Sequence, residues 1–185
     1  MKVARSVGII NRVKSILCCD LLKTLYYSLI HPYLHYCNIV WDNATKLALN
    51  RLICLQKRAM RLLTNSYYRA SSKLLFHRLG ILKVNDIHRL QIGLFMFKAK
   101  NKLLPSSCSH HISAETINHT YSLRVQNTFE MISFRTELRR KYIGVSGPIL
   151  WQSLPELTRE SLSLHNFKTL MINASVASYG QLRIN

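Results

Sequence analysis

The segment of the chain best suited to binding phosphate is the basic hexapeptide Gln56-Lys57-Arg58-Ala59-Met60-Arg61. If the hexapeptide is helical, Lys57 and Arg61 lie four residues apart with Arg58 beside them, so the cations form a row. A row of this kind can follow the phosphate backbone of a nucleic acid while apolar neighbours anchor the helix. The alternative is a solvated basic face that binds nothing.

More cations flank the hexapeptide, and few acidic residues are present to neutralise them. The residues that we predict to contact nucleic acid are Lys57, Arg58, Arg61, Arg51 and Arg69. Tyr67 and Tyr68 come directly before the last of these. Their rings either stack on the bases of a single strand or cover the core.

Acidic residues that could support catalysis are scarce and scattered. The three aspartates, Asp20, Asp42 and Asp86, have no acidic neighbour in the sequence. Two-metal phosphoryl transfer needs carboxylates that hold two ions about 4 Å apart, and the aromatic-x-Asp-Asp turn of polymerases is missing. Neither a Gly-x-Ser-x-Gly elbow nor a glycine-rich phosphate loop is present. We therefore expect no enzyme activity from the chain on its own, and no cofactor.

Two groups of histidines and cysteines have the composition of a zinc site. In the first, His31 and His35 lie four residues apart and Cys37 follows, but Pro32 distorts the helix that would align them. The second lies in a polar region and comprises Cys108, His110, His111 and His119. It has too few thiolates at close spacing for a zinc knuckle. We predict no metal at either group: without metal, the first consists of polar groups at the ends of an aromatic-rich helix and the second of a solvated loop. Zinc near Cys108 stays open.

The charge of the whole chain predicts an anionic partner. Its 185 residues include 26 Lys and Arg but 8 Asp and Glu, so the formal net charge is +18. Nucleic acid is the commonest such partner, because binding releases counterions from its phosphates; an acidic membrane surface comes second. No apolar run approaches the roughly 20 residues that cross a bilayer, so we expect no membrane partner. Five scattered cysteines are typical of reduced thiols and an intracellular location, in the cytoplasm or nucleus.

Apolar residues recur at helical spacing through most of the chain, which predicts a mainly α fold. The expected helices cover residues 5–17, 21–33, 49–63, 72–80, 86–97 and 161–173. Asp20 and Asn85 are suited to cap the helices that follow them. Pro32 either kinks its helix or restarts it, and Gly80 suits a left-handed C-terminal cap.

The composition of the sequence changes near residue 104, where a proline and several serines form a polar break and the helical periodicity weakens. We therefore expect a helical region over residues 1–104 and a less regular C-terminal tail over residues 105–185, with a short final helix. Within the tail, two glycines and two prolines predict an irregular path over residues 139–157.

Several short motifs follow one another in the order and spacing of a known family. The longest is LYYSLIHPYLHYC at residues 25–37, which closes with Val40-Trp41. The others are the basic hexapeptide at 56–61, LGILKV at 79–84, KLLP at 102–105, YSLR at 121–124, GPILWQSLP at 147–155 and NFK at 166–168. Together they resemble the region after the catalytic palm in reverse transcriptases of non-LTR retrotransposons of the LINE and jockey kind.

This resemblance implies a helical thumb-like bundle and C-terminal tail, with the palm and its catalytic aspartates placed before Met1. A thumb of this family grips the duplex of template and primer, which implies RNA or an RNA–DNA duplex as the partner. No catalytic residue or zinc knuckle is carried over. Large aromatic residues usually dominate cores, so we expect four of them to hold the fold: Tyr33, Tyr36, Trp41 and Trp151.

The resemblance and the charge together predict a fragment of a LINE-type RNA-directed DNA polymerase. Such a fragment lacks the catalytic palm and retains binding of RNA or DNA with little sequence preference. Two alternatives stay open. One is a non-catalytic protein-interaction or structural module that self-associates through an exposed apolar face, and the other is an inactive transposon relic.

Overall fold

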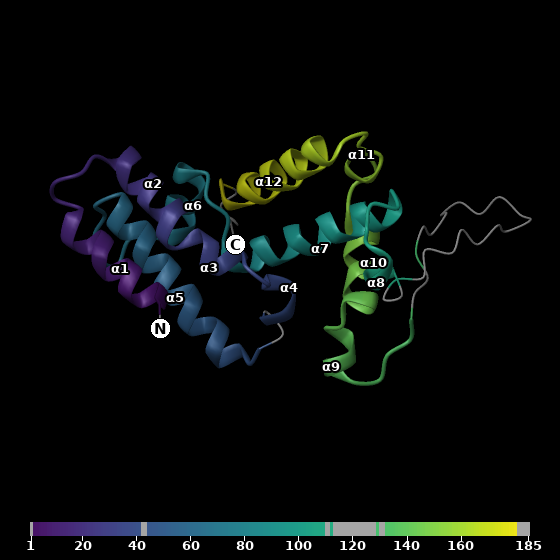
Figure 1. Cartoon of the computed structure of the whole chain (residues 1–185). Helices are drawn as coiled ribbons and strands as arrows, with labels where there is room; N and C mark the ends of the chain where they lie inside the picture. Colours follow the sequence, from purple (N-terminus) through teal and green to yellow (C-terminus); the bar gives the residue numbers. More distant parts are fainter. Residues whose placement is uncertain (1, 42–43, 110–111, 113–128, 130–131, 181–185) are drawn as a thin grey trace, which may run out of the picture. The chain divides into compact units, whose positions relative to one another are not determined.

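The computed structural model of the chain describes residues 2–41, 44–109, 112, 129 and 132–180 (Figure 1). These residues are mainly helical; they contain no strand, and none of their helices is long and apolar enough to cross a bilayer. The twelve helices among them are α1 (Lys2–Val13), α2 (Cys19–Leu29), α3 (His31–His35), α4 (Asn38–Trp41), α5 (Lys46–Leu63), α6 (Ser72–Leu79), α7 (Val84–Lys100), α8 (Ser106–Ser109), α9 (Glu137–Arg140), α10 (Ile143–Ser153), α11 (Glu156–Arg159) and α12 (Leu164–Gly180). The prediction of a mainly α fold with a less regular C-terminal part that ends in a helix is confirmed.

The chain divides into two units. Unit 1 comprises residues 1–88 and 172–185, and unit 2 comprises residues 89–171. This division does not coincide with the boundary expected near residue 104. The reason is that Phe97, near the end of α7, packs on Phe167 of α12 inside unit 2, with ring centroids 5.0 Å apart.

Unit 1 is built on a bundle of four helices. Helices α1, α2 and α5 pack on one another, and α6 packs on α5 (Figure 1). The largest fully buried side chains of this bundle and the segments next to it are Ile10, Tyr26, Ile30, Leu34, Gln56, Met60, Leu63, Phe76, Ile81 and Ile87. Burial of a large apolar side chain contributes about 1.5–3 kcal/mol, so this core fixes which face of each helix is turned to solvent.

Two helices of unit 1 begin differently from the prediction. Helix α2 starts at Cys19 with Cys18 as its N-cap, so Asp20 lies in the first turn. The negative charge of Asp20 interacts favourably there with the positive end of the helix dipole. Helix α7 starts at Val84, so Asn85 lies inside the first turn. Its cap comes from elsewhere, because the Val84 N–H donates to Oε1 of Gln56 at 3.0 Å. The predictions that Asp20 and Asn85 act as N-caps are therefore wrong.

Two other helix boundaries are as predicted. Helix α2 ends at Leu29 and the chain restarts as α3 with Pro32 in the first turn, where a missing N–H does no harm. Helix α6 ends at Gly80, which adopts the left-handed conformation with φ 64°. A glycine takes this conformation without the steric penalty that a Cβ brings.

Of the four aromatic residues expected to hold the fold, the two tyrosines do not. Tyr33 is 46% exposed and Tyr36 is 78% exposed, because Leu34 occupies the inward position of the short helix α3. Trp41 packs against the unit 1 core, and its Nε1 donates to the Tyr36 carbonyl at 2.7 Å. Trp151 is 2% exposed.

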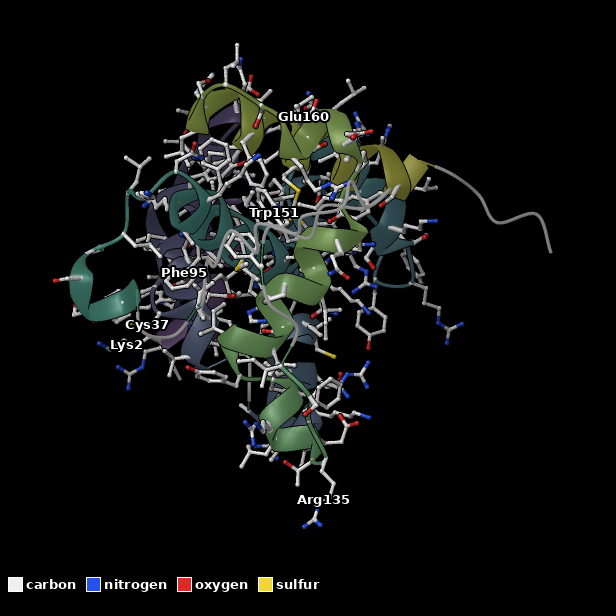
Figure 2. The ribbon with its side chains drawn as sticks, turned by 90° about the vertical axis from the view of Figure 1, so that its right-hand side faces the viewer. Lys2, Cys37, Phe95, Arg135, Trp151 and Glu160 are labelled. Atoms are coloured by element: carbon white, nitrogen blue, oxygen red, sulfur yellow. The ribbon has the colours of Figure 1, made fainter. Side chains whose placement is uncertain are left out.

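Unit 2 has an aromatic core around Trp151. Its ring stacks on Phe167 with centroids 5.8 Å apart, and Phe129 meets its edge at 5.7 Å. In Figure 2 the Trp151 side chain lies among other side chains, whereas Arg135 extends away from the ribbon. This core ties α10 to α12 within the unit.

The irregular path expected over residues 139–157 is wrong for most of the segment. Helix α10 runs through it with Pro148 inside. Pro148 cannot donate to the Gly144 carbonyl and its ring crowds that group, yet both residues are buried. Gly147 permits the close packing that offsets this loss, because a Cβ added there would lie 2.5 Å from Sδ of Met96.

Candidate nucleic-acid interface

Helix α5 carries four of the five residues predicted to contact nucleic acid. Thr45 caps its start by accepting a hydrogen bond from the Ala48 N–H at 3.4 Å. The residues that it buries are Leu52, Gln56, Ala59, Met60 and Leu63. Because this side is fixed in the core, Arg51, Arg58 and Arg61 are held on the other side of the helix.

The outward side of α5 forms part of a surface groove in unit 1 with a volume of about 1110 Å³. Its cationic lining consists of Lys14, Arg51, Lys57, Arg58 and Arg61, and we call it the basic groove. None of the described residues that line it is acidic. A concave surface lined by charges of one sign concentrates the electrostatic potential and attracts counterions.

Arg61 differs from the other cations because it also holds the structure. Its Nε donates to the carbonyl of Ala70 at 3.2 Å, and its guanidinium lies 6.0 Å from the centroid of the Tyr68 ring. Arg51 and Arg58 are exposed along the same helix. Arg51 and Arg58 are therefore better targets for testing binding than Arg61.

The two tyrosines after α5 do not cover the core. Tyr67 is 78% exposed and Tyr68 is 82% exposed, and Tyr68 lines the basic groove. The turn before them is fixed by a hydrogen bond of 2.7 Å between the hydroxyls of Thr64 and Ser66. An exposed ring beside a row of cations is an arrangement found where single strands stack their bases.

The structure brings together Arg51, Lys57, Arg58 and Arg61 in the basic groove, as the sequence predicts for neighbouring helical positions. Arg69 is exposed but does not line the groove. Sequence reasoning did not select Lys14, which reaches the groove from the end of α1. The sequence feature that could have pointed to Lys14 is its place near Arg5 and Arg12 in the first expected helix. Spacing along the chain does not show that Lys14 lies next to α5.

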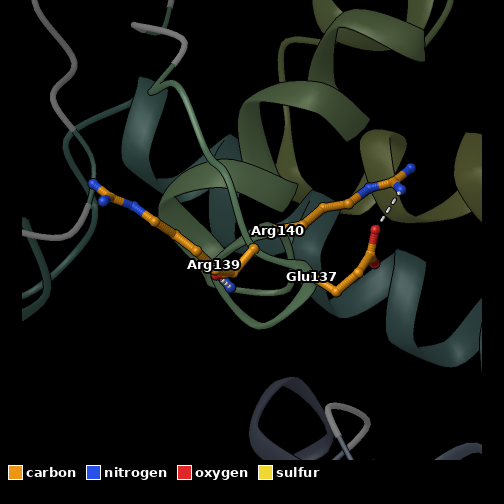
Figure 3. Close-up of polar contacts among 4 residues, drawn as sticks. Glu137, Arg139 and Arg140 are labelled. Atoms are coloured by element: carbon orange, nitrogen blue, oxygen red, sulfur yellow. Dashed lines mark hydrogen bonds and ion pairs between the residues drawn. The ribbon is translucent and has the colours of Figure 1, made fainter.

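In unit 2, the short helix α9 presents further cations. Thr136 caps this helix by accepting from the Arg139 N–H at 3.3 Å. Arg140 reaches back to Glu137 at 3.4 Å, and Figure 3 shows Arg139 pointing away from this pair. The two arginines of α9 therefore face different directions. The exposed ion pair of Arg140 with Glu137 contributes little to stability.

Among the described residues, no cluster of three or more potential metal ligands occurs. The rings of His31 and His35 lie 5.0 Å apart between centroids, and Cys37 is exposed. Cys108 is partly buried with a free thiol. The histidines at 110, 111 and 119 lie outside the described residues.

The described residues thus form mainly helices. The bundle of unit 1 carries the basic groove, whose described lining contains no acidic residue. Comparison with protein-family models, with characterised proteins and with solved structures gives no match. Of the sequence motifs named above, the segment at residues 25–37 lies on α2 and α3, the basic hexapeptide on α5, LGILKV across α6 and α7, most of GPILWQSLP on α10 and NFK on α12, whereas KLLP lies between α7 and α8. The YSLR motif lies outside the described residues.

Proposed function

We propose that this chain is a non-catalytic module that binds the backbone of RNA or of an RNA–DNA duplex through the basic groove. The observation that carries the proposal is the groove itself: in the part of the chain that the structure describes, five cations line it and no acidic residue does. Contacts to phosphate carry no sequence information. The binding is therefore expected to show little sequence preference.

We further propose that the chain derives from the thumb and tail of a LINE-type reverse transcriptase and acts inside the cell. Support comes from the sequence motifs and from the basic face of α5, which suits a duplex. Among the described residues, Asp20 lies exposed on α2 and Asp86 accepts a hydrogen bond from Tyr179. Metal-dependent phosphoryl transfer requires carboxylates gathered in one site, and the described residues contain no group of three or more potential metal ligands.

The proposal predicts how affinity depends on salt. Each phosphate contact contributes about −0.9 to the slope of log affinity against log salt on duplex DNA. If the five groove cations each bind one phosphate, the slope is about −4.5. Removal of two of them flattens the slope by about 1.8.

The experiment measures binding of the full chain to a labelled RNA–DNA hybrid over a range of salt concentrations. The test variant is Arg51→Glu with Arg58→Glu, which spares the contact of Arg61 with Ala70. The charge-matched control is Lys98→Glu with Lys168→Glu, since both lysines are exposed and neither lines the groove. Weaker binding and a flatter slope in the test variant alone support the groove. Equal slopes in both variants, or no binding at low salt, would rule it out.

Self-association through apolar surface is the second candidate function. Tyr36 and Val40 are 78% and 72% exposed at the junction of α3 and α4, and exposed apolar patches favour association. Sedimentation velocity over a range of concentrations tests this. A monomer at every concentration removes this candidate and leaves nucleic-acid binding untouched.

A further inference from the structure

A second hollow lies in unit 1, beside the basic groove. Its volume is about 390 Å³, and its lining comes from α5, from the start of α6 and from the segment that leads into α7. Lys57, Lys73 and Lys83 line it together with the amides of Asn50 and Asn85, and we call it the lysine hollow. Asn50 and Lys57 line both the lysine hollow and the basic groove.

Lys83 is held in the hollow by aromatic and backbone contacts. Its Nζ lies 3.9 Å from the centroid of the Tyr179 ring and 6.0 Å from that of Phe76. The Lys83 N–H donates to the Tyr179 hydroxyl at 3.2 Å, and that hydroxyl in turn donates to Asp86. The hydroxyl of Tyr179 therefore positions the backbone of Lys83, and its ring positions the ammonium.

The chain on either side of Lys83 is fixed as well. Gln56 donates to the Leu82 carbonyl at 2.8 Å and accepts from the Val84 N–H at 3.0 Å. Gln56 itself is buried in the bundle. Lys83 thus sits between two anchored residues, and a site that is ordered before its ligand arrives loses less entropy on binding.

The ammonium groups are close enough to influence one another. Burial is the largest cause of a lowered pKa at Lys83; the carboxylate of Asp86 raises that pKa, and Lys73 and Lys57 lower it further. The like charges of Lys73 and Lys57 thus disfavour the protonated state of Lys83. An anion in the hollow would relieve this repulsion.

We propose that the lysine hollow binds a phosphoryl group, with Lys57, Lys73 and Lys83 as its contacts. Ammonium groups bind phosphate oxygens through charge-assisted hydrogen bonds, and the amides of Asn50 and Asn85 provide further donors. The volume of 390 Å³ is in the range of small-molecule sites and accommodates a diphosphate.

Two kinds of ligand can supply the phosphoryl group. One is a free diphosphate, which binds independently of the function proposed above. The other is the terminal phosphate of a strand that occupies the basic groove, and this source rests on that proposed function. Shared lining by Asn50 and Lys57 makes the two sites contiguous.

The first measurement is calorimetric titration of the full chain with inorganic pyrophosphate at constant ionic strength. The double variant Lys73→Gln, Lys83→Gln is expected to bind at least about tenfold more weakly, because a hydrogen bond to a charged group contributes about 1.5–3 kcal/mol. Lys73→Gln alone, which leaves the contact of Lys83 with Tyr179 intact, is expected to weaken binding in the same direction. The control Lys98→Gln, Lys168→Gln should bind like the original chain. Equal affinity in all of these chains, or no binding at low salt, would overturn the site.

A second measurement separates the sources. RNA oligomers of one sequence are compared with a 5′-phosphate and with a 5′-hydroxyl end. A preference for the phosphate that disappears in Lys73→Gln, Lys83→Gln assigns the hollow to strand ends, whereas pyrophosphate binding without that preference assigns it to a free diphosphate. Arg51→Glu, Arg58→Glu should lose the oligomers and keep pyrophosphate, so failure of the groove and failure of the hollow are distinguishable.

Discussion

Gln56 on α5 donates a hydrogen bond of 3.0 Å to the hydroxyl of Tyr26 on α2. The same amide group donates to the Leu82 carbonyl, and its oxygen accepts the Val84 N–H. All the hydrogen-bonding atoms of this buried side chain are thus satisfied by three segments of unit 1. Because Lys57 and Arg58 follow directly, the polar anchor also sets the orientation of the basic face of α5.

Replacement of Gln56 by leucine is expected to lower the free energy of unfolding by about 2–4 kcal/mol. The change leaves the Leu82 carbonyl and the Val84 N–H without their partner, and a buried unsatisfied group costs about 1–3 kcal/mol. Urea denaturation measures the difference. Asn11→Leu on the exposed side of α1 is the matched control and should change stability by less than about 0.5 kcal/mol. Equal effects at the two positions would contradict the anchoring role.

The stability of unit 1 is expected to fall in alkali because of Tyr26. Burial raises the pKa of its hydroxyl above the ordinary value of 10.0, and the hydrogen bond from Gln56 offsets part of this rise. The folded chain therefore holds this proton more tightly than the unfolded chain does. The resulting stability is fully present below pH 10.0 and is lost as pH rises from there toward the folded pKa.

The variant Tyr26→Phe tests this link between protonation and stability. Its free energy of unfolding is measured by urea denaturation at several pH values between neutral and alkaline. The variant should show a shallower fall above about pH 10 than the original chain. Burial also raises the pKa of Tyr27, so part of the fall should persist in this variant and diminish in Tyr27→Phe. Parallel curves for the original chain and Tyr26→Phe would exclude Tyr26 as the cause.

Two glycines of unit 1 should respond to alanine with opposite signs. Gly80 has φ 64°, so Gly80→Ala is expected to destabilise by about 1–2 kcal/mol even though nothing lies within 4 Å of the added Cβ. Gly8 lies inside α1 with equally open surroundings, and Gly8→Ala should stabilise by about 0.5–1 kcal/mol. Urea denaturation of both variants makes the comparison. The same sign at both sites would mean that backbone conformation does not decide the outcome.

Local chemistry made several features of this chain predictable from sequence. The stripe on α5, the restart at Pro32 and the end of α6 at Gly80 each depend on residues within one or two helical turns. The clustering of Arg51, Lys57, Arg58 and Arg61 follows from the same periodicity, because one helix carries them all.

Features that depend on contacts between distant segments were not predictable. The cap of α7 comes from Gln56, 28 residues before Val84 in the chain. Lys14 joins the groove because α1 packs on α5. Pro148 is tolerated inside α10 because of tertiary packing, which local propensity does not include.

In unit 2, Gly147→Ala is expected to destabilise by about 1–3 kcal/mol, the range for overpacking a core. The added Cβ would lie 2.5 Å from Sδ of Met96, so α10 or the methionine must move. Met96→Ala removes the obstructing atom at its own cost of about 2–5 kcal/mol. The double variant should therefore lose less stability than the sum of the single variants, as measured by urea denaturation. Strict additivity would mean that the two residues do not meet.

Cys54 offers a direct probe of the basic groove. It is exposed on α5 between Arg51 and Arg58, and its side chain lines the groove. A nucleic acid bound there should cover the thiol and slow its alkylation by N-ethylmaleimide severalfold. Added salt should restore the rate, because phosphate contacts weaken as salt rises.

Cys37 is the internal reference for this measurement, since it is exposed in unit 1 and does not line the groove. Peptide mass spectrometry resolves the two thiols in one sample, so both rates come from the same mixture of chain and RNA–DNA hybrid. Protection of Cys54 with unchanged alkylation of Cys37 places the hybrid against α5. Equal protection of both thiols would indicate coating or aggregation of the chain, and an unprotected Cys54 in a sample that binds hybrid would place the nucleic acid on another surface.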